Sequence, residues 1–161
     1  MQERRHPSAK MSVCMLDDLI LAVGRRAPGG EVIGWLERQV LSMPTSERAV
    51  YLQVVLPTPD ASPEVAESSR RAMVHFGQAC QSRLQGAAFA LLLDGFLGAT
   101  VRSVLAAALM AARPSIPVKM FGSVSEASTW LGRTTGASMP PAEQLTAHVA
   151  RLAGDMGLTL P

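Results

Sequence analysis

The stretch Phe89-Ala-Leu-Leu-Leu-Asp94 decides the predicted fold. A short run without a polar residue before its final Asp is typical of a strand covered on both faces, like the central strand of an α/β sheet. Periodicity alone also permits a helix here. The run is strand-like in length, however, Gly86 stands just before it, and Asp94-Gly95 is a turn signal that closes it. We therefore predict a central strand.

Strand and helix patterns alternate on both sides of this strand. Ala49–Leu56 is β-branched and mostly apolar, and Val118–Phe121 is short, so both are predicted strands. Helical spacing of apolar residues predicts helices at residues 62–85 and 99–113. Alternation of this kind predicts a mostly parallel sheet with right-handed crossovers. The strands at Ala49 and Val118 should lie on either side of the Phe89 strand.

The N-terminal part contributes a predicted hairpin and a helix. Ser12–Leu16 and Leu19–Val23 are apolar runs separated by Asp17-Asp18, which indicates two antiparallel strands, with one longer bent strand as the alternative. Glu31–Met43 has apolar residues on one helical face, an acid at its start and Pro44 after its end. Residues 1–10 are charged and aperiodic, and we predict a flexible tail.

Two further helices complete the chain. Ser123 and Glu126 form a capping-box pattern that opens a short helix, predicted to pack Val124, Ala127, Trp130 and Leu131. After a polar linker, residues 141–156 carry an apolar stripe that must either pack back on the domain or contact another chain. The predicted fold class is α/β, in the order β-β-α-β-α-β-α-β-α with about four or five strands and an extra C-terminal helix. The predicted organisation is a tail at 1–10, a domain at 11–132, and a linker with the last helix at 133–161.

Composition restricts the function classes. The net charge is only +2 and aromatic residues make up 4%, so we predict no nucleic-acid partner. The apolar run at 101–112 is too short to span a bilayer and contains Arg102, and no secretory signal is visible, so we predict a cytoplasmic protein without membrane insertion. Cys14 and Cys80 are predicted to be reduced, buried thiols.

Known catalytic and metal-binding patterns are missing from the sequence. His6, His75 and His148 lie far apart, and neither Glu-x-x-His, Cys-x-x-Cys nor Gly-x-Ser-x-Gly occurs. We therefore predict no catalytic residues, no metal site and no cofactor.

The order of elements resembles the STAS domain of anti-sigma-factor antagonists and sulfate-transporter tails. Three segments are similar to it: Asp60-Ala-Ser62 to the phosphoacceptor turn, Thr100–Leu105 to the third helix, and Val118–Ala127 to the last strand and the helix that follows. The resemblance covers roughly residues 13–131, and the Asp-Ser-Ser-Gly turn of the family is replaced by a loop with three prolines. It implies a STAS-like fold and a non-enzymatic regulatory or protein-interaction module in bacterial-type signalling, acting on a protein partner or as a homodimer.

Two sets of residues are candidate sites. Ser62, with Asp60 and Thr58, is a candidate phosphoacceptor or partner surface, since a helix N-terminus stabilises a phosphate; the alternative is that Ser62 only caps its helix. Asp94, Gly98 and Thr100 follow the central strand, where open α/β sheets bind ligands, and the alternative is a plain strand-to-helix turn. The second functional hypothesis is therefore a nucleotide- or lipid-binding sensor, or an unrecognised enzyme that uses this edge of the sheet.

Overall fold

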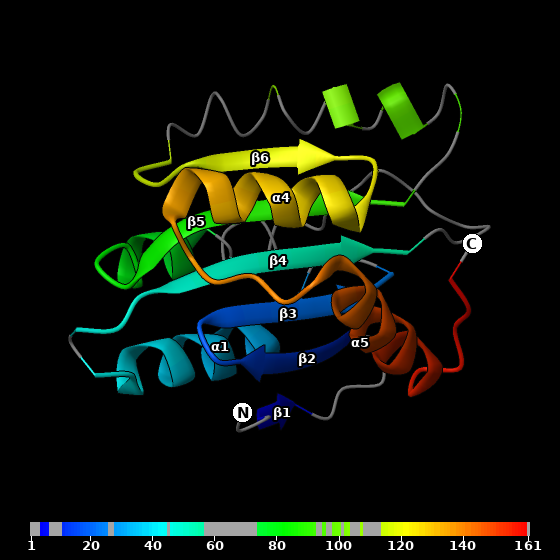
Figure 1. Ribbon diagram of the computed structural model, residues 1–161. Helices are drawn as coiled ribbons and strands as arrows, with labels where there is room; N and C mark the ends of the chain where they lie inside the picture. The colour runs from blue at the N-terminus through cyan, green and yellow to red at the C-terminus, as the bar shows by residue number, and fades with distance from the viewer. Residues whose placement is uncertain are drawn as a thin grey trace.

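The computed structural model describes most of the chain in one sheet with helices on both faces (Figure 1). The described residues are 4–6 (backbone only), 11–25, 28–44, 46–56, 74–92, 95, 98–100, 102–103, 107 and 114–160. Six strands run in the spatial order β1-β2-β3-β4-β5-β6. They are β1 Arg4–His6, β2 Met11–Leu16, β3 Leu19–Gly24, β4 Ala49–Val55, β5 Leu84–Leu91 and β6 Val118–Phe121.

The sheet is mixed and mostly parallel, as predicted. β1, β2 and β3 pair antiparallel, and β3 through β6 pair parallel, so that the carboxyl ends of these four strands lie at the same edge. β5 lies between β4 and β6, which confirms the two predicted neighbours of the Phe89 strand. The strand is not at the centre of the sheet, however, because β5 is second from the edge that β6 forms.

β2 and β3 form the predicted hairpin rather than one bent strand. Asp17 adopts a left-handed conformation with φ 51° in the turn. Asp tolerates this conformation better than most side chains do. The first segment differs from the prediction: Arg4–His6 lies inside the expected flexible tail but forms β1. It pairs with Val13–Met15, since the outer edge of β2 otherwise has unpaired backbone N–H and C=O groups.

β5 begins earlier than predicted, at Leu84 instead of Phe89. The preceding helix was expected to reach about residue 85, but the N–H groups of Arg83 and Leu84 both donate to the Cys80 carbonyl and end it. Gly86 is inside the strand, not at its boundary. A Cβ on Gly86 would lie 2.9 Å from Cγ2 of Thr135, so glycine permits the close approach of a helix there.

Helices cover the two faces of the sheet separately. α1 (Gly30–Ser42) lies on one face, and α4 (Val124–Thr135) and α5 (Ala142–Gly154) lie on the other, in front of the sheet in Figure 1. Because successive strand side chains alternate, Ile20 of β3 packs with α1, whereas Leu19 and Leu21 pack toward α4 and α5. Both faces of β3 and β4 are therefore buried.

The last helix packs back on its own domain. Leu145, Val149 and Leu152 of α5 are at most 1% exposed and belong to the same hydrophobic cluster as β3 and β4. Of the two alternatives for the apolar stripe of this helix, the structure shows the first: the stripe packs on the sheet of its own chain.

α4 is longer than predicted. It continues four residues beyond the expected end at Leu131, through the predicted domain boundary at residue 132, to Thr135. Gly136 then caps it in the left-handed conformation with φ 73°. Glycine adopts this conformation without the steric cost of a Cβ, which explains the position of the helix end.

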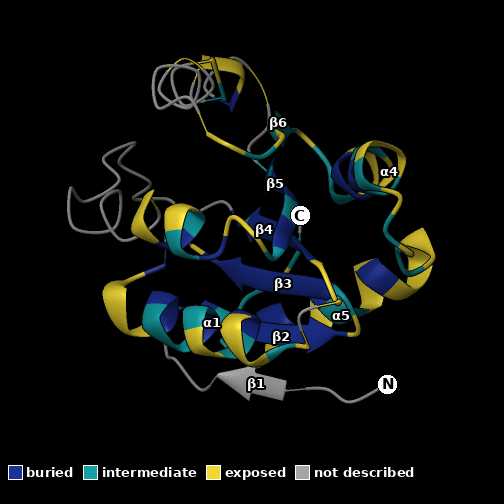
Figure 2. Ribbon diagram, turned by 90° about the vertical axis from the view of Figure 1, so that its left-hand side faces the viewer, coloured by how far each residue is buried: buried dark blue, intermediate teal, exposed yellow. Residues whose placement is uncertain are grey.

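Burial decreases toward β6. Nearly every residue of β2, β3 and β4 is buried, whereas β6 has no buried residue and Lys119 is exposed. Figure 2 shows the same gradient: β3 is dark blue, while β6 and the outer side of α4 are teal and yellow. In the part of the chain that is described, no helix is both long and apolar enough to cross a bilayer.

Candidate functional site

Most of the predicted site residues lie outside the described part of the chain. This holds for Thr58, Asp60, Ser62 and Asp94. Of the candidate ligand edge, Gly98 is buried and Thr100 is exposed on a helical segment. The phosphoacceptor site and the ligand-binding edge therefore both stay predictions.

A buried hydrogen bond joins two side chains of β4. The Tyr51 hydroxyl donates to Oε1 of Gln53 at 3.2 Å, and the residues are 1% and 2% exposed. Burial raises the pKa of Tyr51, which keeps the phenol neutral. The Tyr51 ring also contacts Phe76 and Phe89 edge-on, with centroids 6.0 and 6.1 Å apart. This arrangement satisfies polar groups in the core and gives the phenol no access to a substrate.

The cysteines are free and buried, as predicted. Burial, and secondarily the negative charge of Glu37, raises the pKa of the Cys80 thiol to about 11. A thiol with so high a pKa is almost entirely protonated near neutral pH, whereas the thiolate is the nucleophile. Cys80 therefore has a packing role on the α1 face.

His75 lies on the surface. Its Nε2 is 3.4 Å from Oε2 of Glu37 on α1, and the His75 side chain is 68% exposed. His148 is half-buried, with Nδ1 2.9 Å from a guanidinium nitrogen of Arg151. Among the residues that the structure describes, no three His, Cys, Asp or Glu side chains are grouped so that they could hold a metal ion.

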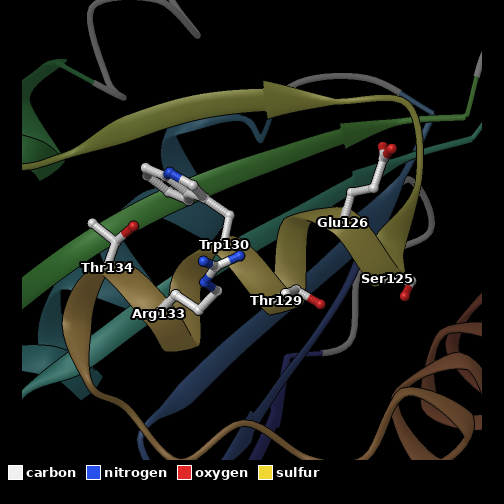
Figure 3. A pocket seen from close by; sticks show the side chains of 6 residues that line it. All are labelled: Ser125, Glu126, Thr129, Trp130, Arg133 and Thr134. Carbon is white, nitrogen blue, oxygen red and sulfur yellow. The ribbon is translucent and has the colours of Figure 1, made fainter.

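The outer face of α4 carries an open groove. Six side chains line it, in two rows with i, i+4 spacing that lie next to each other on a helix: Ser125, Thr129 and Arg133, and Glu126, Trp130 and Thr134. Figure 3 shows these side chains along the exposed side of the helix. Trp130 is the largest of these six side chains, and it is partly exposed.

Trp130 connects this groove to β6. Its ring packs on Phe121 with centroids 5.6 Å apart and the planes tilted by 48°. Nζ of Lys119 lies 5.5 Å from the centroid of Phe121, within the range of a cation–π contact. We call Lys119, Phe121, Trp130 and Arg133 the margin surface. Its two aromatic side chains are only partly buried, and its two cations are exposed.

The margin surface is held in place by the cap and the buried residues of α4 and by the pairing of β6. The Ser123 hydroxyl accepts a hydrogen bond from the Glu126 N–H at 3.2 Å. This bond confirms the N-cap of the predicted capping box. Ala127 and Leu131 are fully buried and hold α4 on the sheet. Phe121 is held by the pairing of β6 with β5.

The prediction that Trp130 packs in the core is right only in part. In a helix, Trp130 is next to Leu131 but about 100° around the axis, so it falls at the edge of the buried stripe. Its large ring covers the edge of the core with one side and borders the groove with the other. The alternation in β6 indicates that Lys119 and Phe121 share one face of the strand, but it does not place them beside Trp130.

The chain matches no protein-family model, no curated protein and no solved structure.

Proposed function

We propose that this chain is a non-enzymatic, STAS-like regulatory module of bacterial-type signalling that works by binding a protein partner. The resemblance of its element order to the STAS domain supports the family assignment, and the mixed sheet with α4 and α5 is compatible with it. The observation that carries the proposal is the partly exposed Phe121–Trp130 pair beside the groove on α4.

Trp, Tyr and Arg side chains dominate the binding energy of protein interfaces, and the aromatic ones bury a large area on few rotatable bonds. Here Trp130 and Arg133 lie one helical turn apart on a rigid element, and burial of the rest of the Trp130 ring would add to the affinity. Homodimerisation through α5 loses its support, since the stripe of that helix is covered by the sheet.

Quantitative capture of proteins from a lysate of the source organism tests the proposal. The baits are the wild-type chain, Trp130→Ala, and Leu41→Ala, which removes an apolar residue that is 46% exposed on α1 as a matched control. We expect at least one protein that wild type and Leu41→Ala enrich equally and that Trp130→Ala captures at least tenfold less. Direct titration with that protein, once purified, must reproduce the difference.

The proposal fails if wild type enriches no protein over empty resin and light scattering finds only monomers over the micromolar range. A partner captured equally by all three baits would keep the interaction function but place it on another surface.

A further inference from the structure

We infer that the margin surface binds an acidic peptide segment whose apolar side chain packs on Trp130. This inference rests on the proposed function and specifies its partner. It comes from the charge around the aromatic pair and from the geometry of α4 and β6.

The charges of the margin surface are mainly positive. Lys119 and Arg133 are both exposed beside the Phe121–Trp130 pair, one on β6 and one on α4. Glu126 is the carboxylate among the six residues that line the groove. Complementary potentials select the partner and speed its association, so this distribution favours Asp and Glu.

The aromatic pair supplies the anchor between these charges. Trp130 is partly buried and lines the groove, and its ring points from α4 toward the neighbouring strands, beside Thr134 (Figure 3). An apolar side chain placed there would contact the ring, while acidic neighbours in the same segment reach Lys119 and Arg133. A central apolar contact with a charged rim is the usual arrangement of a specific interface.

Addition of a partner strand to β6 is disfavoured by the same residues. β6 has only four residues, and exposed Lys119 lies in its middle; short length and lysine both discourage pairing of further strands. Recognition by side chains in the groove is therefore favoured over extension of the sheet.

Selection from a phage-displayed library of random 12-residue peptides tests the inference. The targets are wild type, Trp130→Ala, the charge-reversed double variant Lys119→Glu/Arg133→Glu, and Arg38→Glu/Arg48→Glu. The last variant is the matched control, because it changes net charge equally with basic residues of α1 and the loop before β4. Circular dichroism first establishes that all four are folded.

We expect wild type and the control to select net-acidic peptides that contain an apolar residue. Synthetic peptides of that set should bind Lys119→Glu/Arg133→Glu and Trp130→Ala at least tenfold more weakly, and new selection on the charge-reversed variant should yield basic peptides. Acidic peptides that bind all variants equally, or peptides without a charge bias, overturn the inference but leave a peptide-binding function. If no peptide is selected and the lysate yields no partner either, the inference and the proposed function both fail.

Discussion

Two groups of aromatic side chains in this molecule have contrasting surroundings. In the first group, the Tyr51 ring contacts Phe76 and Phe89 edge-on, on the face of the sheet that α1 covers. Tyr51 is 1% exposed. Phe121 and Trp130 pack on each other at the opposite side of the sheet, where both are partly exposed and Lys119 lies over one ring.

We call Tyr51, Phe76 and Phe89 the inner group, and Phe121 and Trp130 the outer pair. The difference in burial indicates that the inner group stabilises the fold, whereas the outer pair can bind a partner. The inner group has a polar atom, the Tyr51 hydroxyl, which is satisfied within the chain by Gln53. The outer pair is next to cations that are exposed to solvent. Burial is nearly complete for Tyr51 and Phe76 and incomplete for the outer pair, so the outer pair has more free energy to gain from a partner. Substitutions in the two groups should therefore separate stability from binding.

Truncation of the inner group should have the largest effect. Tyr51→Ala removes a fully buried ring, and we expect the free energy of unfolding to fall by about 3–5 kcal/mol. Trp130→Ala should cost roughly half as much or less, because its ring is partly exposed already. Urea unfolding followed by circular dichroism measures both; equal losses would contradict the contrast between the two groups.

Removal of the Tyr51 hydroxyl alone should have the next largest effect. Tyr51→Phe removes the hydroxyl that donates to buried Oε1 of Gln53. We expect a loss of about 1–3 kcal/mol. Tyr51→Phe/Gln53→Leu should be more stable than Tyr51→Phe, because no buried acceptor is then left without this donor. A double-mutant cycle in urea gives the coupling; additive losses would mean that the hydrogen bond contributes nothing.

Gly86→Ala should destabilise the packing of α4 on β5, and α4 carries Trp130 and Arg133 of the margin surface. The new Cβ would lie 2.9 Å from Cγ2 of Thr135 and 3.4 Å from the Pro117 carbonyl oxygen. We expect destabilisation of about 1–3 kcal/mol from overpacking. Thr135→Ser deletes that methyl group but keeps the hydroxyl that donates to the Leu131 carbonyl, so Gly86→Ala/Thr135→Ser should recover part of the loss. No recovery would place the strain at Pro117.

The sequence alone predicted the strands and helices whose apolar residues recur at regular spacing within the element itself. The apolar run of Leu19–Gly24 and the apolar face of α1 depend on burial that strand and helix patterns report directly. The start of β5 was not predictable in this way. Gly86 and Ala87 have low strand preference, and they form a strand because β4 pairs with both of them and α4 packs closely against Gly86.

The margin surface was less predictable than the fold. Helical spacing places Trp130 beside Leu131, but only the position of β6 determines that Phe121 and Lys119 meet it. Such contacts join different elements and leave no short-range pattern. The sequence proposes Ser62 by its place at a predicted helix N-terminus and Asp94 by its place after a strand, and both lie outside the described residues.

The free energy of unfolding should depend on pH through Cys80, which is buried on the α1 face of the sheet. Cys80 has a folded pKa raised from 9.0 to about 11, so its neutral thiol contributes fully to stability below pH 9. As the pH rises from 9 to about 11, the unfolded thiol ionises first and that contribution is lost. The free energy of unfolding should therefore fall more steeply over this interval for wild type than for Cys80→Ala. Parallel slopes in urea titrations across that pH interval would contradict it.

Neutralisation of Lys119 should have the smallest effect on stability. Lys119→Met keeps most of the aliphatic stem but removes the charge over Phe121. An exposed cation–π contact contributes only about 0.5–1 kcal/mol, so we expect a loss no larger than that. Lys119→Arg, the matched control, keeps the cation and should unfold like wild type in urea.

A large loss for Lys119→Met would contradict the contrast between the two aromatic groups. A loss above about 2 kcal/mol exceeds what an exposed cation–π contact supplies and would mean that the outer pair is part of the core. A small loss of stability together with a tenfold loss of acidic-peptide binding is the result that assigns Lys119 to recognition, because no packing role could produce both.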